Sequence, residues 1–216
     1  CIWYTEEYQR MFDLMTESVL KDKTLKEKFK NIKKIYFSRR KFGKAAATEF
    51  GEEYIEQCFN QNGYESLGPE TLTLREQIYV WNHAEAIACM NGTIPLNVVF
   101  CKNEKLKLTI LNKMSIYHKN PYIYLYMRNI QAEFIDIYKE PLKGYPKSLG
   151  EGPYLIKTGK EFFHYCQREK FEIPYTGMKL KFYDLKQEIR YYLCVIGIGN
   201  KIRRVGSYIK RKMLRR

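Results

Sequence analysis

The sequence lacks the clustered ligands that mark most metal sites and disulfide frameworks. Its six cysteines include no CxxC pair, and its three histidines are distant from one another along the chain. Cysteines scattered in this way are typical of buried or free thiols in a reducing compartment. We therefore expect no metal site, no disulfide framework and no bound cofactor.

A long apolar segment is also missing. The longest apolar run, Tyr191 to Gly199, is too short to cross a bilayer, and no secretory signal precedes the first predicted helix. Because the first residue is Cys1 rather than Met, we expect the chain to be a piece of a longer protein. Together with the free thiols, these features predict a cytoplasmic location.

Positive charge is plentiful but unevenly placed. The chain holds 38 basic and 24 acidic residues, which gives a net charge of +14. Residues 201–216 contain eight basic residues and no acid, so the remaining 30 basic and 24 acidic residues leave +6. In this tail Ile202, Val205, Ile209 and Met213 recur at spacings of three and four, which predicts a cationic amphipathic helix. Such a helix fits an anionic membrane surface; the alternatives are a frayed, solvated helix or packing against another lobe.

The composition and the hydrophobic periodicity predict an α/β fold. Hydrophobic residues make up 45% of the 216 residues, enough to bury a substantial core. The predicted helices cover residues 4–30, 52–61, 74–84, 94–101 (a short helix or turn), 121–131 and 158–168, and the predicted strands cover residues 33–38, 64–67, 86–90, 106–111 and 134–138. Short strands that alternate with helices indicate a Rossmann-like, mainly parallel sheet with flanking helices. We assign residues 1–178 to this lobe and 179–216 to a basic amphipathic C-terminal helical segment.

Local signals support these assignments. Thr73 followed by Glu76 makes a capping box for the helix over 74–84. The stretch from Lys143 to Gly152 is rich in Gly, Pro and Ser, which predicts a mobile loop.

Two turns that follow predicted strands form a candidate anion site. The first is Ser38-Arg39-Arg40 and the second is Asn91-Gly92-Thr93. Because parallel strands gather their carboxyl ends at one edge of a sheet, we expect both turns to face a single ligand. Gly92 permits a close backbone approach, and Thr93 is placed to cap a helix whose first N–H groups then face a phosphate. The alternative is an ordinary turn without a ligand, which many α/β proteins have.

Several separate segments carry a resemblance to a known family over roughly residues 4–170. The segments are Lys34-Ile35-Tyr36-Phe37-Ser38-Arg39, Gly51-Glu52-Glu53, Gly63-Tyr64, Pro69-Glu70 with Leu72-Thr73-Leu74-Arg75-Glu76-Gln77-Ile78, Asn91-Gly92-Thr93 with Asn97 and Phe100, Asn120-Pro121-Tyr122, and Phe134-Ile135-Asp136. In order and spacing they resemble the C-terminal lobe of glycosyltransferase family 61, in its bacterial capsular-polysaccharide branch.

The resemblance implies a GT-B architecture, in which two Rossmann-like lobes enclose a cleft and the C-terminal lobe binds the nucleotide of the sugar donor. It implies an inverting, metal-independent transferase for capsular or other surface polysaccharide, with a nucleotide-sugar donor and a saccharide or lipid-linked acceptor. The family's arginine falls on Arg39, its histidine-glycine-alanine turn on Asn91-Gly92-Thr93, and its next asparagine on Asn97. Asn91 replaces the histidine, so this position has no proton-transfer group. The acceptor site and any base supplied by the N-terminal lobe are missing, and no catalytic residue is assigned.

The candidate substrate-binding residues come from both turns and from the helices beside them. They are Arg39, Arg40, Gln77, Asn91, Gly92, Thr93 and Asn97. Without a metal, the charge on a leaving diphosphate needs donors already in place, and the planar fork of Arg39 suits two phosphate oxygens at once. Gln77 is placed to reach the ribose or base, and Glu52 is either a helix-start carboxylate or a ribose contact. The alternatives are that Arg39 and Arg40 are solvated and that Asn97 only holds its turn.

Two other classes compete with a sugar transferase. The charge and the 19 tyrosines suggest a basic nucleic-acid-binding module, but the excess charge lies in the tail and no nucleic-acid motif is present. We therefore expect no nucleic-acid partner. The replacement at Asn91 suggests the other class, a non-catalytic nucleotide-binding lobe. Our first expectation is an enzyme held peripherally on the inner face of the cell membrane through residues 201–216.

Overall fold

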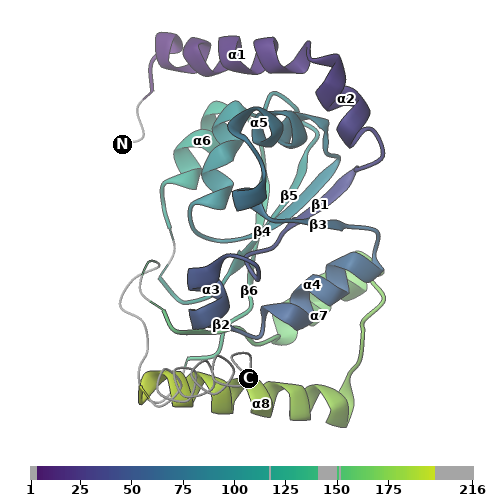
Figure 1. The fold of residues 1–216 in the computed structure, drawn as a ribbon, viewed down its shortest axis with the longest axis vertical. Helices are drawn as coiled ribbons and strands as arrows, with labels where there is room; N and C mark the ends of the chain where they lie inside the picture. Colours follow the sequence, from purple (N-terminus) through teal and green to yellow (C-terminus); the bar gives the residue numbers. More distant parts are fainter. Residues whose placement is uncertain (1–3, 117, 141–149, 151, 198–216) are drawn as a thin grey trace, which may run out of the picture.

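The computed structural model describes residues 4–116, 118–140, 150 and 152–197, and it confirms the predicted α/β class (Figure 1). A five-stranded sheet with all neighbouring strands parallel lies between layers of helices. In spatial order its strands are β3 (Glu65–Leu67), β1 (Lys34–Phe37), β4 (Ala86–Met90), β5 (Lys107–Asn112) and β6 (Ala132–Asp136). The parallel pairing agrees with the predicted mainly parallel sheet, and each of these strands begins and ends within two residues of its predicted bounds.

Both faces of the sheet are covered, which explains why its central strand is apolar throughout. Successive side chains of a strand point to opposite faces, so Ile35 and Phe37 join one core cluster and Tyr36 joins the other. The helices of the first face are α1 (Glu6–Leu20), α2 (Lys23–Phe29), α5 (Leu74–His83), the 3-10 helix η2 (Ile94–Phe100) and α6 (Pro121–Met127). The second face is covered by α4 (Glu52–Gln61) and α7 (Lys160–Arg168).

A second, two-stranded parallel sheet pairs β2 (Glu49–Phe50) with β7 (Tyr154–Leu155). The short helix α3 (Gly43–Thr48) leads into β2, and the long helix α8 (Gly177–Val195) packs on this sheet through Tyr191. Gly51 joins β2 to α4 with φ +108°, and a Cβ there would lie 2.1 Å from the carbonyl oxygen of Ile156. Only glycine fits that junction, which fixes the direction of α4 relative to β2.

Some predicted elements differ from the observed ones. The helix predicted over residues 4–30 is two helices, because Asp22 accepts hydrogen bonds from the backbone N–H groups of Thr24 and Leu25 and so caps α2 as a new helix. The helix predicted over 121–131 ends earlier, at Met127. The capping box of Thr73 and Glu76 is confirmed.

Two expectations fall outside the described part of the chain. The basic tail, residues 201–216, lies wholly outside it, and so does most of the loop predicted over 143–152. Helix α8 covers the start of the segment assigned to residues 179–216. No helix within the described ranges has both the length and the apolar character needed to span a bilayer.

Candidate functional site

The strand order places a topological switch point between β1 and β4. The chain leaves β1, crosses one face through α4 to β3, and then returns across the other face through α5 to β4. The connection that follows β1 and the connection that precedes β4 therefore lie on opposite faces of the sheet, although β1 and β4 are neighbours. The carboxyl ends of these two strands are the topological switch point of the sheet. Ligands of open α/β sheets bind at such a point, and here it is formed by residues 38–40 and 91–93.

Arg39 and Gly92 meet at this switch point. The Nη1 atom of Arg39 lies 3.7 Å from the position that a Cβ on Gly92 would occupy. The expected convergence of the two turns is therefore confirmed. The other terminal nitrogen, Nη2, lies 3.2 Å from Oε1 of Glu49, which fixes the direction of the guanidinium. Binding of a ligand by Arg39 stays a prediction.

A buried lysine shares the same carboxylate. Lys113 follows β5, is 1% exposed, and donates from Nζ to Oε1 of Glu49 over 2.7 Å. Burial lowers the pKa of Lys113, an effect that the neighbouring Glu49 opposes. Two cations, Arg39 and Lys113, thus face one carboxylate, and the side chains of Lys113 and Glu49 are almost closed to water.

Polar atoms without a protein partner mark the same place. Within the described residues, Nε of Arg39, Oε2 of Glu49 and Oδ1 of Asn91 are buried and make no hydrogen bond. Buried polar groups in native proteins nearly always have a partner, so an unsatisfied group calls for an explanation. Nε of Arg39 is a donor, which an anionic oxygen satisfies, whereas the two oxygens are acceptors, which need a donor such as a ligand hydroxyl group.

Asn91 begins a row of polar side chains along the strand ends. Its Nδ2 donates to Oδ1 of Asn112, and Nδ2 of Asn112 donates to Oδ1 of Asp136, each over 2.8 Å. These residues follow or end β4, β5 and β6 in turn. The row holds the Asn91 turn against the sheet and gives it a fixed orientation.

Glu52, at the start of α4, lies under the Arg39 turn. Its Oε1 accepts hydrogen bonds from the backbone N–H of Arg39 over 2.8 Å and from the hydroxyl of Tyr36 over 3.2 Å. Burial raises the pKa of Glu52 to about 7, and the charge of Glu49 adds to the rise, although both hydrogen bonds oppose it. The carboxyl group is therefore close to half protonated at neutral pH.

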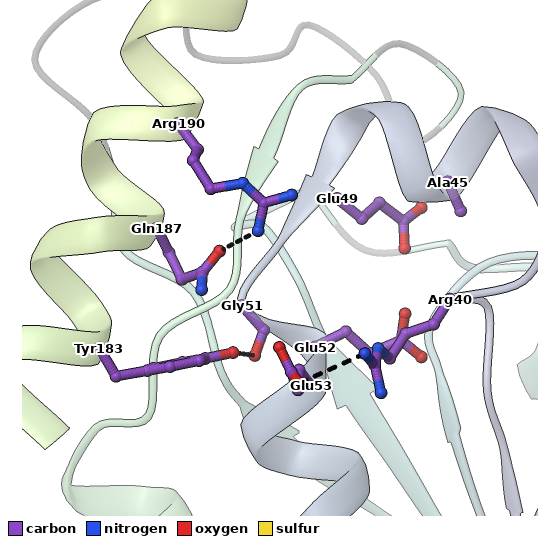
Figure 2. A pocket seen from close by; sticks show the side chains of 9 residues that line it. All are labelled: Arg40, Ala45, Glu49, Gly51, Glu52, Glu53, Tyr183, Gln187 and Arg190. Atoms are coloured by element: carbon purple, nitrogen blue, oxygen red, sulfur yellow. Dashed lines mark hydrogen bonds and ion pairs between the residues drawn. The ribbon is translucent and has the colours of Figure 1, made fainter. Parts of the chain in front are cut away.

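A polar cavity of about 210 Å³ opens beside this cluster (Figure 2). It is lined by Arg40, Ala45, Glu49, Gly51, Glu52, Glu53, Tyr183, Gln187 and Arg190. Arg40 is anchored at its border by Oε2 of Glu56, 2.6 Å away, and by Glu53. From α8, Arg190 and Gln187 point toward the junction of β2 and α4, and Arg190 donates to Gln187 over 2.8 Å. Glu49 thus borders both the switch point and the cavity.

Gln77 and Asn97 bind each other. Nδ2 of Asn97 donates to Oε1 of Gln77 over 2.8 Å, and Nε2 of Gln77 donates to the carbonyl groups of Pro69 and Leu72. In this structure both amides therefore hold loops together. Their predicted contact with a ligand stays a prediction.

The prediction that Thr93 caps the following helix is wrong. Its side chain makes no cap hydrogen bond, and the segment that follows is a seven-residue 3-10 helix. Pro95, near its start, also has no N–H to donate. The loop of residues 91–93 therefore does not lead into the N-terminus of an α-helix, as the prediction required.

Sequence reasoning assigned no role to Glu49, Lys113 or Asn112. Asn112 and Lys113 carry a usable signal, since they are polar residues directly at the end of an apolar strand, as Asn91 is. Glu49 carries none, because it lies in a strand of only two residues. No group of three or more His, Cys, Asp or Glu side chains in the described ranges is arranged to hold a metal ion.

Comparison with known proteins gives one match. A family model described as Glycosyltransferase 61 matches residues 3–111, just over half of the 216-residue chain. The matched region holds α1 to β5 and therefore both turns of the switch point. No curated protein matches the chain.

Proposed function

The chain belongs to the glycosyltransferase 61 family, and on that premise we propose that it is the donor-binding lobe of a GT-B enzyme. It binds the nucleotide-sugar donor, and the enzyme transfers the sugar with inversion of the anomeric centre. The observation that carries this proposal is the meeting of Arg39 and Gly92 at the switch point, where the charge of Arg39 adds to the buried pair of Lys113 and Glu49. A pyrophosphate is the part of such a donor that matches this charge.

Arg39 is the residue that receives the developing charge of the leaving diphosphate. Glu49 holds its Nη2, while Nη1 faces Gly92. A guanidinium held in this way donates to phosphate oxygens without first having to be ordered, which is the condition for transition-state stabilisation. Lys113 is a positioning residue, since it neutralises Glu49 and so leaves the charge of Arg39 for the ligand.

The finer parts of the proposal follow the family resemblance. The acceptor is a saccharide or a lipid-linked saccharide of capsular or other surface polysaccharide synthesis, and transfer needs no metal. The enzyme works in the cytoplasm at the inner face of the membrane, and residues 201–216 assist the contact with anionic lipid. Arg40, Gln77, Asn91, Thr93 and Asn97 are further candidates for donor contacts. The base that activates the acceptor comes from another lobe.

A thermal-shift titration with nucleoside diphosphates tests the donor site. Ligand at about 100 times its Kd stabilises a protein by about 2.7 kcal/mol, a shift of about 5 °C or more for a domain of this size. We expect a shift of this kind for the wild type and none for Arg39→Ala. Arg39→Lys keeps the charge but loses the fork, so we expect it to retain a small part of the shift.

Arg75→Ala is the matched control, because Arg75 lies exposed on α5 and pairs with Asp22 away from the switch point. Circular dichroism of each unliganded variant establishes that it is folded. Equal shifts for the wild type and a folded Arg39→Ala variant contradict the Arg39 assignment. Salt-dependent binding of random oligonucleotides without any nucleotide shift favours the nucleic-acid class instead.

A further inference from the structure

The outer face of α8 is an apolar stripe with no protein cover within the described residues. Its side chains recur at spacings of three, four and seven, so they share one face of the helix. They are Met178, Phe182, Leu185, Ile189 and Ile196, the last at the C-terminal cap, and each is between 52% and 66% exposed. The opposite face packs on the domain through Leu180, Gln187 and Tyr191. Figure 1 shows α8 along one end of the molecule.

The charges of α8 are sorted by face. Its two acidic residues are turned toward the domain and are paired, Glu188 with Lys139 and Lys157, and Asp184 with Lys157. The exposed lysines of the helix flank the stripe on both sides. They are Lys179, Lys181 and Lys186. The outer surface therefore combines apolar side chains with unbalanced positive charge.

We propose that the outer face of α8 is a docking surface for an anionic lipid bilayer. The stripe enters the boundary between headgroups and acyl chains, and the flanking lysines bind the headgroups. Helix α8 has 19 residues and is about 28 Å long. Because its apolar stripe runs along one side, the helix lies in the plane of the membrane surface. The flanking lysines favour this partner over an uncharged one. An apolar stripe bordered by cations is complementary to a bilayer, which has apolar acyl chains beneath anionic headgroups.

The surface is separate from the proposed donor site. Phe182 and Leu185 point outward from α8, whereas Tyr183 and Gln187 of the same helix line the polar cavity on the inner side. Docking through α8 therefore leaves the switch point, at Arg39 and Gly92, free of lipid. Loss of lipid binding and loss of nucleotide binding are independent outcomes.

Vesicle co-flotation of the full chain tests the proposal. We expect binding to vesicles of phosphatidylcholine with phosphatidylglycerol, and weaker binding to phosphatidylcholine alone or at high salt. The double variant Phe182→Gln, Leu185→Gln keeps good helix formers and removes apolar area. Each truncated side chain is expected to lower the partition coefficient about tenfold or more. The nucleoside diphosphate shift stays unchanged in this variant.

The matched control is Met11→Gln, Leu14→Gln on α1, whose side chains are 48% and 53% exposed. We expect this variant to bind vesicles as the wild type does. Deletion of residues 198–216 separates the two basic surfaces: the shortened chain still binds, and the α8 substitutions still weaken its binding. Binding that is lost with the deletion alone, or that is insensitive to the α8 substitutions, overturns the proposal. The proposal also fails if those substitutions only convert an oligomer into a monomer.

Discussion

Helices α1 and α8 lie at opposite ends of the molecule (Figure 1). They differ in the charges that lie beside their exposed apolar side chains. Both are amphipathic and both expose apolar side chains. Helix α1 carries four acids and one arginine, whereas the exposed charge of α8 is basic. An exposed apolar stripe alone does not identify a partner, and the charges beside it are what distinguish the two helices.

The two helices also rest on different layers. Helix α1 lies over the apolar cluster around Trp81 and is attached by buried polar contacts from Asp13 and Thr16. Helix α8 lies over the polar cavity that Glu52 borders. The α8 end is therefore expected to have a stability that depends on pH near neutrality, through Glu52.

The largest expected effect is at the α1 end. Arg128 is 4% exposed, lies 2.5 Å from Asp13 and donates from Nε to the carbonyl oxygen of Val99 over 2.6 Å. Arg128→Ala leaves a largely buried carboxylate without its partner, which typically costs about 3–5 kcal/mol. Urea denaturation measures this loss. Arg128→Met combined with Asp13→Leu removes both charges and is expected to recover most of it; a double variant as unstable as Arg128→Ala contradicts the attribution to an unpaired charge.

An effect of intermediate size is expected at the α8 end, and it depends on pH. The pKa of Glu52 is about 7 in the folded protein, against an ordinary value of 4.5. The fold therefore favours the protonated form, so the contribution of Glu52 to stability is complete below pH 4.5 and is lost as the pH rises through 7. Glu52→Gln keeps an acceptor but has no proton to lose. Relative to the wild type, it should gain about 3 kcal/mol in unfolding free energy between pH 4.5 and pH 8.

Unfolding of both proteins at several pH values checks this slope. A constant difference between the wild type and Glu52→Gln across that range contradicts the raised pKa. Thr16→Val provides the contrast within the comparison, because it removes no ionisable group and its cost should not change between pH 5.5 and pH 8.

The smallest effect is expected for one hydrogen bond of α1. Thr16 is fully buried, and its hydroxyl donates to the carbonyl oxygen of Phe100 over 2.9 Å. Thr16→Val keeps the shape and removes this donor, while Nδ2 of Asn82 still donates to the same carbonyl oxygen, so the expected cost is about 1 kcal/mol. Thr16→Ser keeps the hydroxyl, so it separates the hydrogen bond from the methyl contact. If Thr16→Ser costs more than Thr16→Val in urea denaturation, packing rather than the bond is what attaches α1 here.

The parts of the fold that sequence reasoning found have strong local causes. The capping box of Thr73 and Glu76 defines the start of α5, and the apolar run of β4 reflects its burial on both faces. The convergence of Arg39 and Gly92 followed from a rule about parallel strands and needed no knowledge of side-chain positions. Single-residue effects were harder to foresee, since only the cap at Asp22 divides the helix predicted over residues 4–30.

The missed parts depend on contacts between distant segments. Strands β2 and β7 have two residues each, which is too short for any periodicity, and their pairing joins residues 49 and 154. Glu49 therefore resembles an ordinary surface acid in the sequence, although in the structure its carboxylate is 2% exposed and binds both cations of the site. The sequence identifies the turns that meet at the switch point but not the carboxylate that orients them.

The pairing of β2 with β7 has a consequence for the order in which the protein matures. All five strands of the large sheet precede residue 137. The strand that holds Glu49 pairs with residues that come later, since Glu49 lies opposite Tyr154 and the N–H of Ile156 donates to the carbonyl oxygen of Phe50. During synthesis on a ribosome, the large sheet can therefore form, with Arg39 at the end of β1, before β2 pairs with β7. The contacts of Glu49 that orient Arg39 are therefore completed only after the strands of the large sheet have been made.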